Sequence, residues 1–229
     1  MPVTRRAFLA TMATSALAPR VGWADDASPG SWPLNLDRSR DGVLYIPKGY
    51  RPGVALPLMV AFHGAGGSGL SCQWAFQQAD EFGVIVLAPD SRDGRTWDII
   101  LGEFGPDGEF LQAAFQQALG RCAVNRERLI IAGHSDGGSY ALSLGIGVGD
   151  QFGQIMAMSP GVMTPFGVAG KPRIFVSHGI HDPVMPIDDT SRKFVSRLRN
   201  LSYDVTYREY DGRHGVPPEV VREGFAWLR

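Results

Sequence analysis

Leu129-Ile130-Ile131-Ala132-Gly133-His134-Ser135-Asp136-Gly137-Gly138 is the stretch that decides the fold. An aliphatic strand runs directly into the pattern Gly-x-Ser-x-Gly, and a helix of small residues follows. This context predicts a sharp strand-to-helix turn that presents the serine hydroxyl. Glycine fits both flanking positions because any side chain there would crowd the neighbouring backbone. We therefore expect Ser135 to be a nucleophile, although a plain turn serine gives the same pentapeptide.

Strand patterns and helix patterns alternate along the rest of the chain. This order predicts an α/β fold with a mostly parallel central sheet and helices on both faces. Strands are expected near residues 43–46, 58–62, 84–88, 129–133, 155–158, 174–177 and 205–207, of which 84–88 and 129–133 are expected to be buried. Helices are expected near residues 71–82, 107–121, 190–201 and 218–228, with Asp107 as an N-cap.

A serine nucleophile needs a base, and His214 is the predicted one. In folds with this turn the partners follow in the order Ser, acid, His, each on a loop after a later strand. Of the three histidines after Ser135, only His214 lies beyond the last expected strand and before the final helix, whereas His178 and His181 come earlier. A surface-loop histidine is the alternative, since Asp211 to Gly215 is also a good turn sequence.

Asp182 is the predicted orienting acid. It follows the strand 174–177, at the carboxyl end where the active sites of open parallel sheets collect. Asp188 and Asp189 are rivals, although their position suits the start of the helix near Thr190 better. An Asp before Pro183 can also be only a turn residue.

Acyl transfer also needs N–H donors for the developing oxyanion. The backbone N–H of Asp136, directly after Ser135, is the first expected donor. The glycine-rich loop 63–67 follows an early strand, and we expect its Ala65 N–H to be the second donor, with Gly64 or Gly66 as alternatives. A flexible glycine turn is the non-catalytic interpretation of this loop.

Taken together, these motifs resemble the phospholipase/carboxylesterase family of α/β-hydrolases. The resemblance rests on residues 133–138, on Ser177-His178-Gly179 with the run from Asp182 to Pro186, and on the stretch from Tyr203 to His214. It implies the α/β-hydrolase fold and a cofactor-free carboxylic-ester hydrolase, in a family that also contains lysophospholipases and acyl-protein thioesterases. The segment 91–108 departs from the typical thioesterase loop, which argues against a protein-deacylating role.

Composition narrows the partners. The chain of 229 residues is 44% hydrophobic and 20% charged, with a formal charge of −1. It shows no basic patch for nucleic acid and no apolar run long enough for a stable membrane anchor. Cys72 and Cys122 are expected to be buried free thiols, and no metal site is expected because neither cysteine has a ligand partner at the right spacing. The expected partner is a small-molecule ester.

The first residues differ from the rest of the chain. Arg5-Arg6-Ala7-Phe8-Leu9 precedes a small-residue apolar run, as in a twin-arginine export signal. We predict a signal peptide over residues 1–24, a single catalytic domain over residues 25–229, and an exported protein, periplasmic or secreted. A disordered N-terminal arm is the alternative.

Few residues separate the strand ending near Met158 from the strand at Ile174, so a minimal lid or none is expected. The open pocket that follows from this favours short or soluble esters. Its expected wall residues, which could equally be ordinary packing, are Trp97, Met163, Phe166 and Val184. An exported polyester or feruloyl esterase, a lysophospholipase and a peptidase share the same triad geometry, and a non-catalytic binding module on this fold is the hypothesis from another class.

Overall fold

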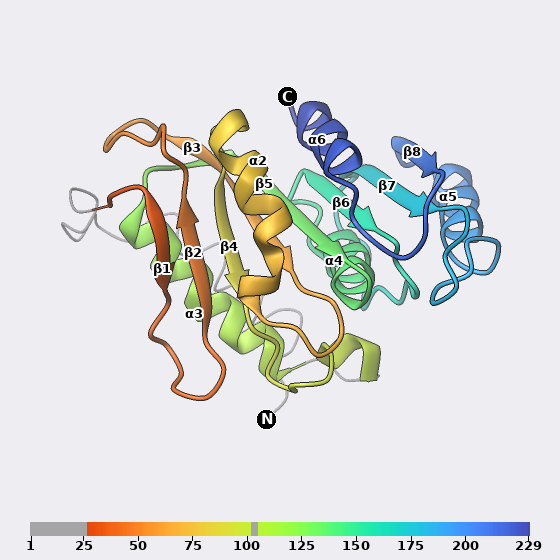
Figure 1. Ribbon diagram of the computed structural model, residues 1–229, viewed down its shortest axis with the longest axis horizontal. Helices are drawn as coiled ribbons and strands as arrows, with labels where there is room; N and C mark the ends of the chain where they lie inside the picture. Colours follow the sequence, from red (N-terminus) through yellow and green to blue (C-terminus); the bar gives the residue numbers. More distant parts are fainter. Residues whose placement is uncertain (1–26, 102–104) are drawn as a thin grey trace.

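The computed structural model describes residues 27–101 and 105–229. Within them, eight strands form one sheet in the order β1-β2-β4-β3-β5-β6-β7-β8, with β1 and β8 at its edges (Figure 1). The strands are β1 Gly30–Pro33, β2 Gly42–Ile46, β3 Leu56–Phe62, β4 Ile85–Pro89, β5 Val124–His134, β6 Gln154–Met158, β7 Arg173–Gly179 and β8 Val205–Tyr210.

The sheet is mostly parallel, as predicted. Strand β2 runs antiparallel to both β1 and β4. Every other neighbouring pair, from β4 across to β8, is parallel. Strands buried on both faces need continuous apolar sequence, and the fully buried run Leu58–Phe62 of β3 meets that need.

Helices cover both faces of this sheet, which confirms the predicted α/β architecture (Figure 1). Apolar side chains of α2 and α6 pack together on one face. Those of α3, α4 and α5 pack on the other face. The helices are α2 Gln73–Phe82, α3 Pro106–Arg121, α4 Asp136–Gly147, α5 Ser191–Asn200 and α6 Pro218–Trp227, with short 3₁₀ helices η1 Gly69–Cys72 and η2 Asp98–Leu101.

The predicted N-cap at Asp107 is wrong. Helix α3 begins one residue earlier, at Pro106, and Gly105 occupies the cap position. The buried Asp107 carboxylate instead accepts the backbone N–H groups of Arg92 and Asp98, so it ties the first turn of α3 to the preceding loop. Burial raises the pKa of Asp107 to about 6.

Strand direction decides where loops can meet. Because β3, β5, β7 and β8 are parallel, their carboxyl ends all lie on the same side of the molecule, at one end of the strands. The loop 63–67, Ser135, Asp182 and His214 each follow one of these strands. Four segments far apart in sequence therefore converge at the carboxyl ends of these strands.

Within the described ranges, no helix is long and apolar enough to cross a membrane. The expected signal peptide over residues 1–24 lies outside the described residues. Cys72 and Cys122 are both buried and free, as predicted.

Candidate active site

Ser135 lies at a strained turn between β5 and α4. Its backbone angles, φ 59° and ψ −122°, are rare for a residue with a side chain. A Cβ atom at Gly133 would lie 2.2 Å from the Gly137 carbonyl oxygen, and one at Gly137 would lie 2.1 Å from the Phe62 carbonyl oxygen. Both glycines are therefore required by backbone packing, and the turn has the geometry that the sequence pattern predicts.

Ser135, His214 and Asp182 lie in one hydrogen-bonded line. The Ser135 Oγ is 2.9 Å from His214 Nε2, and His214 Nδ1 is 2.6 Å from Asp182 Oδ2. The three predicted residues, spread over 79 positions of sequence, are thus brought together within hydrogen-bonding distance. A histidine held in this way can accept a proton from the hydroxyl on one side while the carboxylate stabilises the resulting positive charge on the other.

Neighbouring strands hold the Asp182 and His214 loops against each other. The N–H of Ile180 donates to the Tyr210 carbonyl, and the N–H of His181 donates to the Gly212 carbonyl. The Tyr210 hydroxyl donates to the Gly215 carbonyl at 2.8 Å. The β7 loop and the β8 loop therefore form one hydrogen-bonded unit around the acid and the base.

The Asp182 carboxylate is buried but well supplied with donors. Its Oδ1 accepts the N–H groups of Val184 and Met185, both at 2.9 Å, while Oδ2 faces His214. Burial acts to raise the pKa of Asp182, but the hydrogen bonds from Met185, His214 and Val184 outweigh it and leave that pKa lowered. The carboxylate is consequently charged at neutral pH.

A second imidazole packs beside His214. The ring centroids of His134 and His214 are 4.8 Å apart. Burial, and next the charge of a protonated His214, lower the pKa of His134 to about 4. His134 therefore stays neutral near pH 7 and adds no competing charge to the base.

The glycine-rich loop lies directly against the serine. A Cβ atom on Gly64 would be 3.3 Å from Ser135 Cβ. The N–H of Gly66 donates to the Arg95 carbonyl at 2.8 Å, so it is occupied and cannot serve as an oxyanion donor. The alternatives for the second donor are thereby reduced to Gly64 and Ala65, beside the Asp136 N–H at the start of α4.

The loop from Ser91 to Trp97 is hydrogen-bonded to His63 and to Asp136, next to the expected oxyanion donors. His63 Nε2 accepts the Ser91 N–H at 3.1 Å, and Trp97 Nε1 donates to the His63 carbonyl at 2.9 Å. The Thr96 hydroxyl donates to the Asp136 carboxylate. Thr96 could not be found from the sequence, because a threonine in an irregular loop carries no motif.

Three of the four expected pocket walls are packing residues. Trp97 is 1% exposed and stacks on Tyr140 in the core. Met163 is buried among side chains of α4, α5, β6 and β7, and Phe166 packs against Gly147, about 18 Å along α4 from its start. Val184 is 58% exposed and stands beside Asp182, so it is the one of the four that faces solvent next to the serine's partners.

The segment between β6 and β7 follows α4 instead of covering the site. The N–H groups of Gly161 and Val162 donate to Ser139 Oγ, and that of Thr164 donates to Ser143 Oγ. The segment therefore runs from the first turn of α4 toward its far end, and its short hydrogen-bonded course fits the minimal lid expected from its length.

The rival acids occupy surface ion pairs. Asp188 pairs with Arg192 at 2.8 Å, and Asp189 pairs with Lys193 at 2.7 Å. Helix α5 has Thr190 as its N-cap, so neither aspartate caps it. His181, which was not predicted to be the base, pairs with the exposed Asp211 instead of contacting Ser135.

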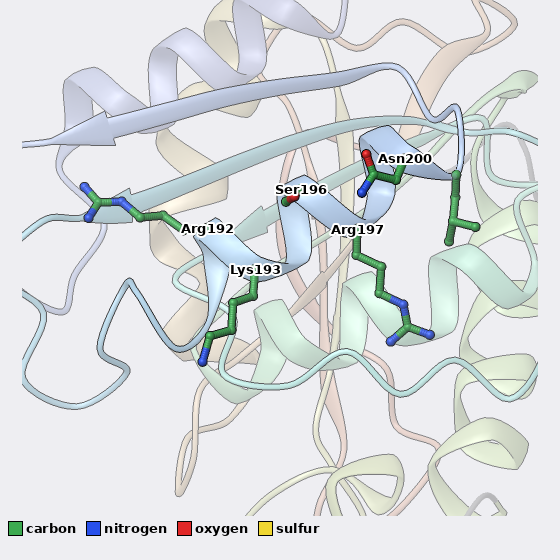
Figure 2. Close-up of a pocket in the computed structure, with 6 residues that line it drawn as sticks. Arg192, Lys193, Ser196, Arg197 and Asn200 are labelled. Atoms are coloured by element: carbon green, nitrogen blue, oxygen red, sulfur yellow. The ribbon is translucent and has the colours of Figure 1, made fainter.

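In the described ranges, no group of three or more His, Cys, Asp or Glu could hold a metal ion. A shallow surface hollow of about 600 Å³ lies on α5, where the Lys193 and Arg197 side chains extend from the same side of the helix (Figure 2). It is lined by Arg192, Lys193, Ser196, Arg197, Asn200 and Leu201. Because all its lining residues come from α5 and the position after it, this hollow is separate from the site at Ser135.

Known proteins of similar sequence are esterases and a thioesterase. The chain is 26% identical over 226 residues to feruloyl esterase C of Emericella nidulans, covering 84% of this chain and 83% of that protein. It is 29% identical over 113 residues to acyl-protein thioesterase 1 of Gibberella zeae, covering 45% of this chain and 48% of the relative. No family model matches the chain.

Solved structures show the same fold. A ferulic acid esterase from Anaeromyces mucronatus, solved with ferulic acid, superposes with a TM-score of 0.67 at 14% identity, over 92% of each chain. The fold and the site define a serine hydrolase of the α/β-hydrolase class. The chain is a carboxylic-ester hydrolase, it is similar in sequence to feruloyl esterases, and its resemblance to carboxylesterases is confirmed.

Proposed function

We propose that the chain cleaves carboxylic esters through an acyl-enzyme, with Ser135 as nucleophile, His214 as general base and Asp182 as the acid that orients it. His214 Nε2 takes the Ser135 proton while Oγ bonds to the ester carbonyl carbon. The tetrahedral intermediate collapses, the alcohol leaves with the proton from His214, and the acyl group stays on Oγ. Water then repeats the sequence and releases the acid.

The oxyanion is held by backbone N–H groups. Asp136 N–H supplies one donor and Ala65 N–H the other, with Gly64 as the remaining alternative. Thr96 fixes the Asp136 side chain, and the contacts of His63 and Trp97 fix the loop. Donors held in this way need little rearrangement when negative charge develops.

The observation that carries this proposal is the 2.9 Å contact between Ser135 Oγ and His214 Nε2, continued at 2.6 Å to Asp182. Its test is hydrolysis of p-nitrophenyl acetate and labelling by a fluorophosphonate. Ser135→Ala should lose turnover by a factor on the order of 10⁴–10⁶ and all labelling. Ser196→Ala, a serine on the α5 hollow, is the matched control and should behave as wild type. Equal labelling of wild type and Ser135→Ala would refute the mechanism.

For the substrate we propose an ester with an aromatic acyl group, such as a hydroxycinnamate. The relatives named feruloyl esterases support this class. The exposed Val184 beside Asp182 offers an apolar contact for a ring at the mouth of the site. Methyl ferulate, p-nitrophenyl butyrate, a lysophospholipid, a polyester and a peptide should be compared by kcat/KM, with methyl ferulate expected highest. A preference for any of the others would assign that substrate class instead.

For location we propose export through the twin-arginine route. Arg5-Arg6 before Phe8-Leu9 and the small-residue run up to Ala24 support it. Replacing both arginines with lysine should retain the protein inside a bacterial host, whereas the unaltered chain reaches the periplasm or medium and is shortened near residue 24. Equal export of both forms would contradict the proposal.

A further inference from the structure

His178 contacts the same carboxylate as His214. It lies at the end of β7, and its side chain has no solvent exposure. Its Nε2 is 3.1 Å from Asp182 Oδ2 and 2.8 Å from the Met185 carbonyl oxygen. Its Nδ1 is 2.6 Å from Ser191 Oγ. From its position in the sequence, His178 comes too early to be the base, and no other role is predicted for it.

The partners of His178 determine where its proton lies. The Met185 carbonyl can only accept, so Nε2 must carry the hydrogen and share it between that carbonyl and Asp182. Nδ1 is then an acceptor, and the Ser191 hydroxyl donates to it. Burial lowers the pKa of His178 and favours this neutral form, outweighing the opposite effect of the Met185 carbonyl and Asp182.

The contact completes the set of donors around Asp182. Oδ1 receives two backbone N–H groups, and Oδ2 receives the N–H of His214. His178 Nε2, whose hydrogen is shared with the Met185 carbonyl, lies 3.1 Å from the same Oδ2. Rotation of the carboxylate would break all four contacts at once. A buried carboxylate that lost one donor would pay an electrostatic penalty and would gain freedom to turn.

We infer that His178, oriented by Ser191, is a positioning residue that fixes the Asp182 carboxylate toward His214 and moderates its negative charge. The inference rests on the proposed function, in which Asp182 orients the base. Two N–H donors on one oxygen share its charge, so removal of His178 leaves Oδ2 more attractive to a protonated His214. The acidic limb of the pH profile should then move to higher pH.

Other titratable groups near this pair are held by their own partners or stay neutral. Glu209 on β8 lies in register with His178 and is paired with Arg192 through two hydrogen bonds. The Tyr210 hydroxyl is bonded to a carbonyl, and its pKa is raised, chiefly by burial. His134 on β5, with a lowered pKa, stays neutral over the measured range. A shift of the acidic limb in a His178 variant therefore reports on the Asp182 and His214 pair.

Two amide substitutions separate donation from simple packing. His178→Gln places an N–H near the position of Nε2 and can still reach Asp182. His178→Asn carries the same polar group on a shorter stem, close to Ser191 and out of reach of Asp182. If His178 only filled space, the two variants would change the pH profile equally or leave it unmoved.

The test measures kcat, KM and the pH dependence of kcat/KM on p-nitrophenyl acetate. His178→Asn should lower kcat by about ten- to a hundredfold, the range for one hydrogen bond to a charged group, with KM within about twofold. The midpoint of its acidic limb should rise by about half a unit, and His178→Gln should restore most of both. Equal profiles in the two variants would overturn the inference.

A second measurement needs no variant. Nitrogen-15 spectra of histidine in the wild-type protein should show His178 as a neutral Nε2–H tautomer throughout the range in which activity titrates. An Nδ1–H tautomer, or titration of His178 with the acidic limb, would also overturn the inference. Failure of the proposed function looks different, because wild type would then hydrolyse the ester no faster than Ser135→Ala.

Discussion

Replacing Asp182 with asparagine tests whether the carboxylate controls the tautomer of His214. Both partners of Oδ1 are backbone N–H groups, which can only donate, so the asparagine must place its carbonyl oxygen there. Its NH₂ group then faces the position of Oδ2, which now accepts the His214 N–H and lies 3.1 Å from His178 Nε2. His214 can bond to this amide only by moving its proton to Nε2, and Ser135 then faces an N–H instead of a base.

The size of the effect follows from these contacts. Asp182→Asn loses two hydrogen bonds to a charged group, each worth about 1.5–3 kcal/mol. A total of about 3–6 kcal/mol corresponds to a fall of about 10²–10⁴ in rate, at about 1.4 kcal/mol per tenfold. Because the tautomer is also reversed, the upper end of this range is expected for kcat.

The assay is turnover of p-nitrophenyl acetate at pH 7, with the thermal midpoint measured in parallel. Asp189→Asn is the matched control, since that side chain is exposed and pairs with the exposed Lys193. The control should keep wild-type kcat, because an exposed ion pair contributes about 0–1 kcal/mol. A kcat of Asp182→Asn within tenfold of wild type would refute the tautomer argument.

Three further outcomes are expected. Gly137→Ala should yield little folded protein, because its Cβ would overlap a carbonyl oxygen at the end of β3, and circular dichroism with soluble yield measures this. Trp97→Ala should lose about 3–5 kcal/mol of unfolding free energy, measured in urea. Val184→Ala should stay within about 0.5 kcal/mol of wild type and should change KM for aromatic esters instead. Equal destabilisation by the two substitutions would contradict a buried Trp97 and an exposed Val184. Cys72 and Cys122 should resist iodoacetamide until the protein unfolds, because burial raises both thiol pKa values, that of Cys122 to about 11, and modification of the folded protein would show otherwise.

Asp107 should make the free energy of unfolding depend on pH. Its pKa in the folded protein, about 6, is above the ordinary value of 3.8, so the folded state holds this proton more tightly than the unfolded state. The contribution to stability is therefore complete below about pH 4 and is lost as the pH rises through 6. Carbon-13 spectra of the aspartate carboxyls should show one group titrating near 6 that disappears in Asp107→Asn. A spectrum without that group would contradict the burial argument.

Much of the fold could be predicted because its determinants are local. The aliphatic runs of β3, β4 and β5 are strands by composition alone, and the parallel order follows from the helices between them. Strand β1 was missed, since Gly30-Ser-Trp-Pro33 has neither length nor alternation and depends on pairing with β2. Asp107 was misjudged because a carboxylate near a helix start can bind either its own helix or a loop, and only the tertiary structure decides.

The site divides in the same way. Ser135, Asp182 and His214 could be named because each follows a strand in a fixed order, and the structure brings them together. The role of Trp97 stayed open between pocket wall and packing, because an aromatic residue in a loop looks the same whether it points into the core or toward substrate. His178 was passed over since its contact with Asp182 depends on the turn that follows β7, which the sequence does not specify.

The crowding at Ser135 limits how this protein can be engineered. At Gly133 and Gly137 the obstructing atoms belong to the backbone, so no second substitution can create room for a side chain. At Gly161 the obstructing atoms are the Met185 side chain, with its sulfur 2.3 Å from a built Cβ. A saturation library should therefore recover only glycine at the first two positions. At Gly161 it should recover alanine or serine together with a smaller residue in place of Met185. This coupled pair of substitutions offers a way to change the shape of the surface beside Asp182 without altering the reacting groups.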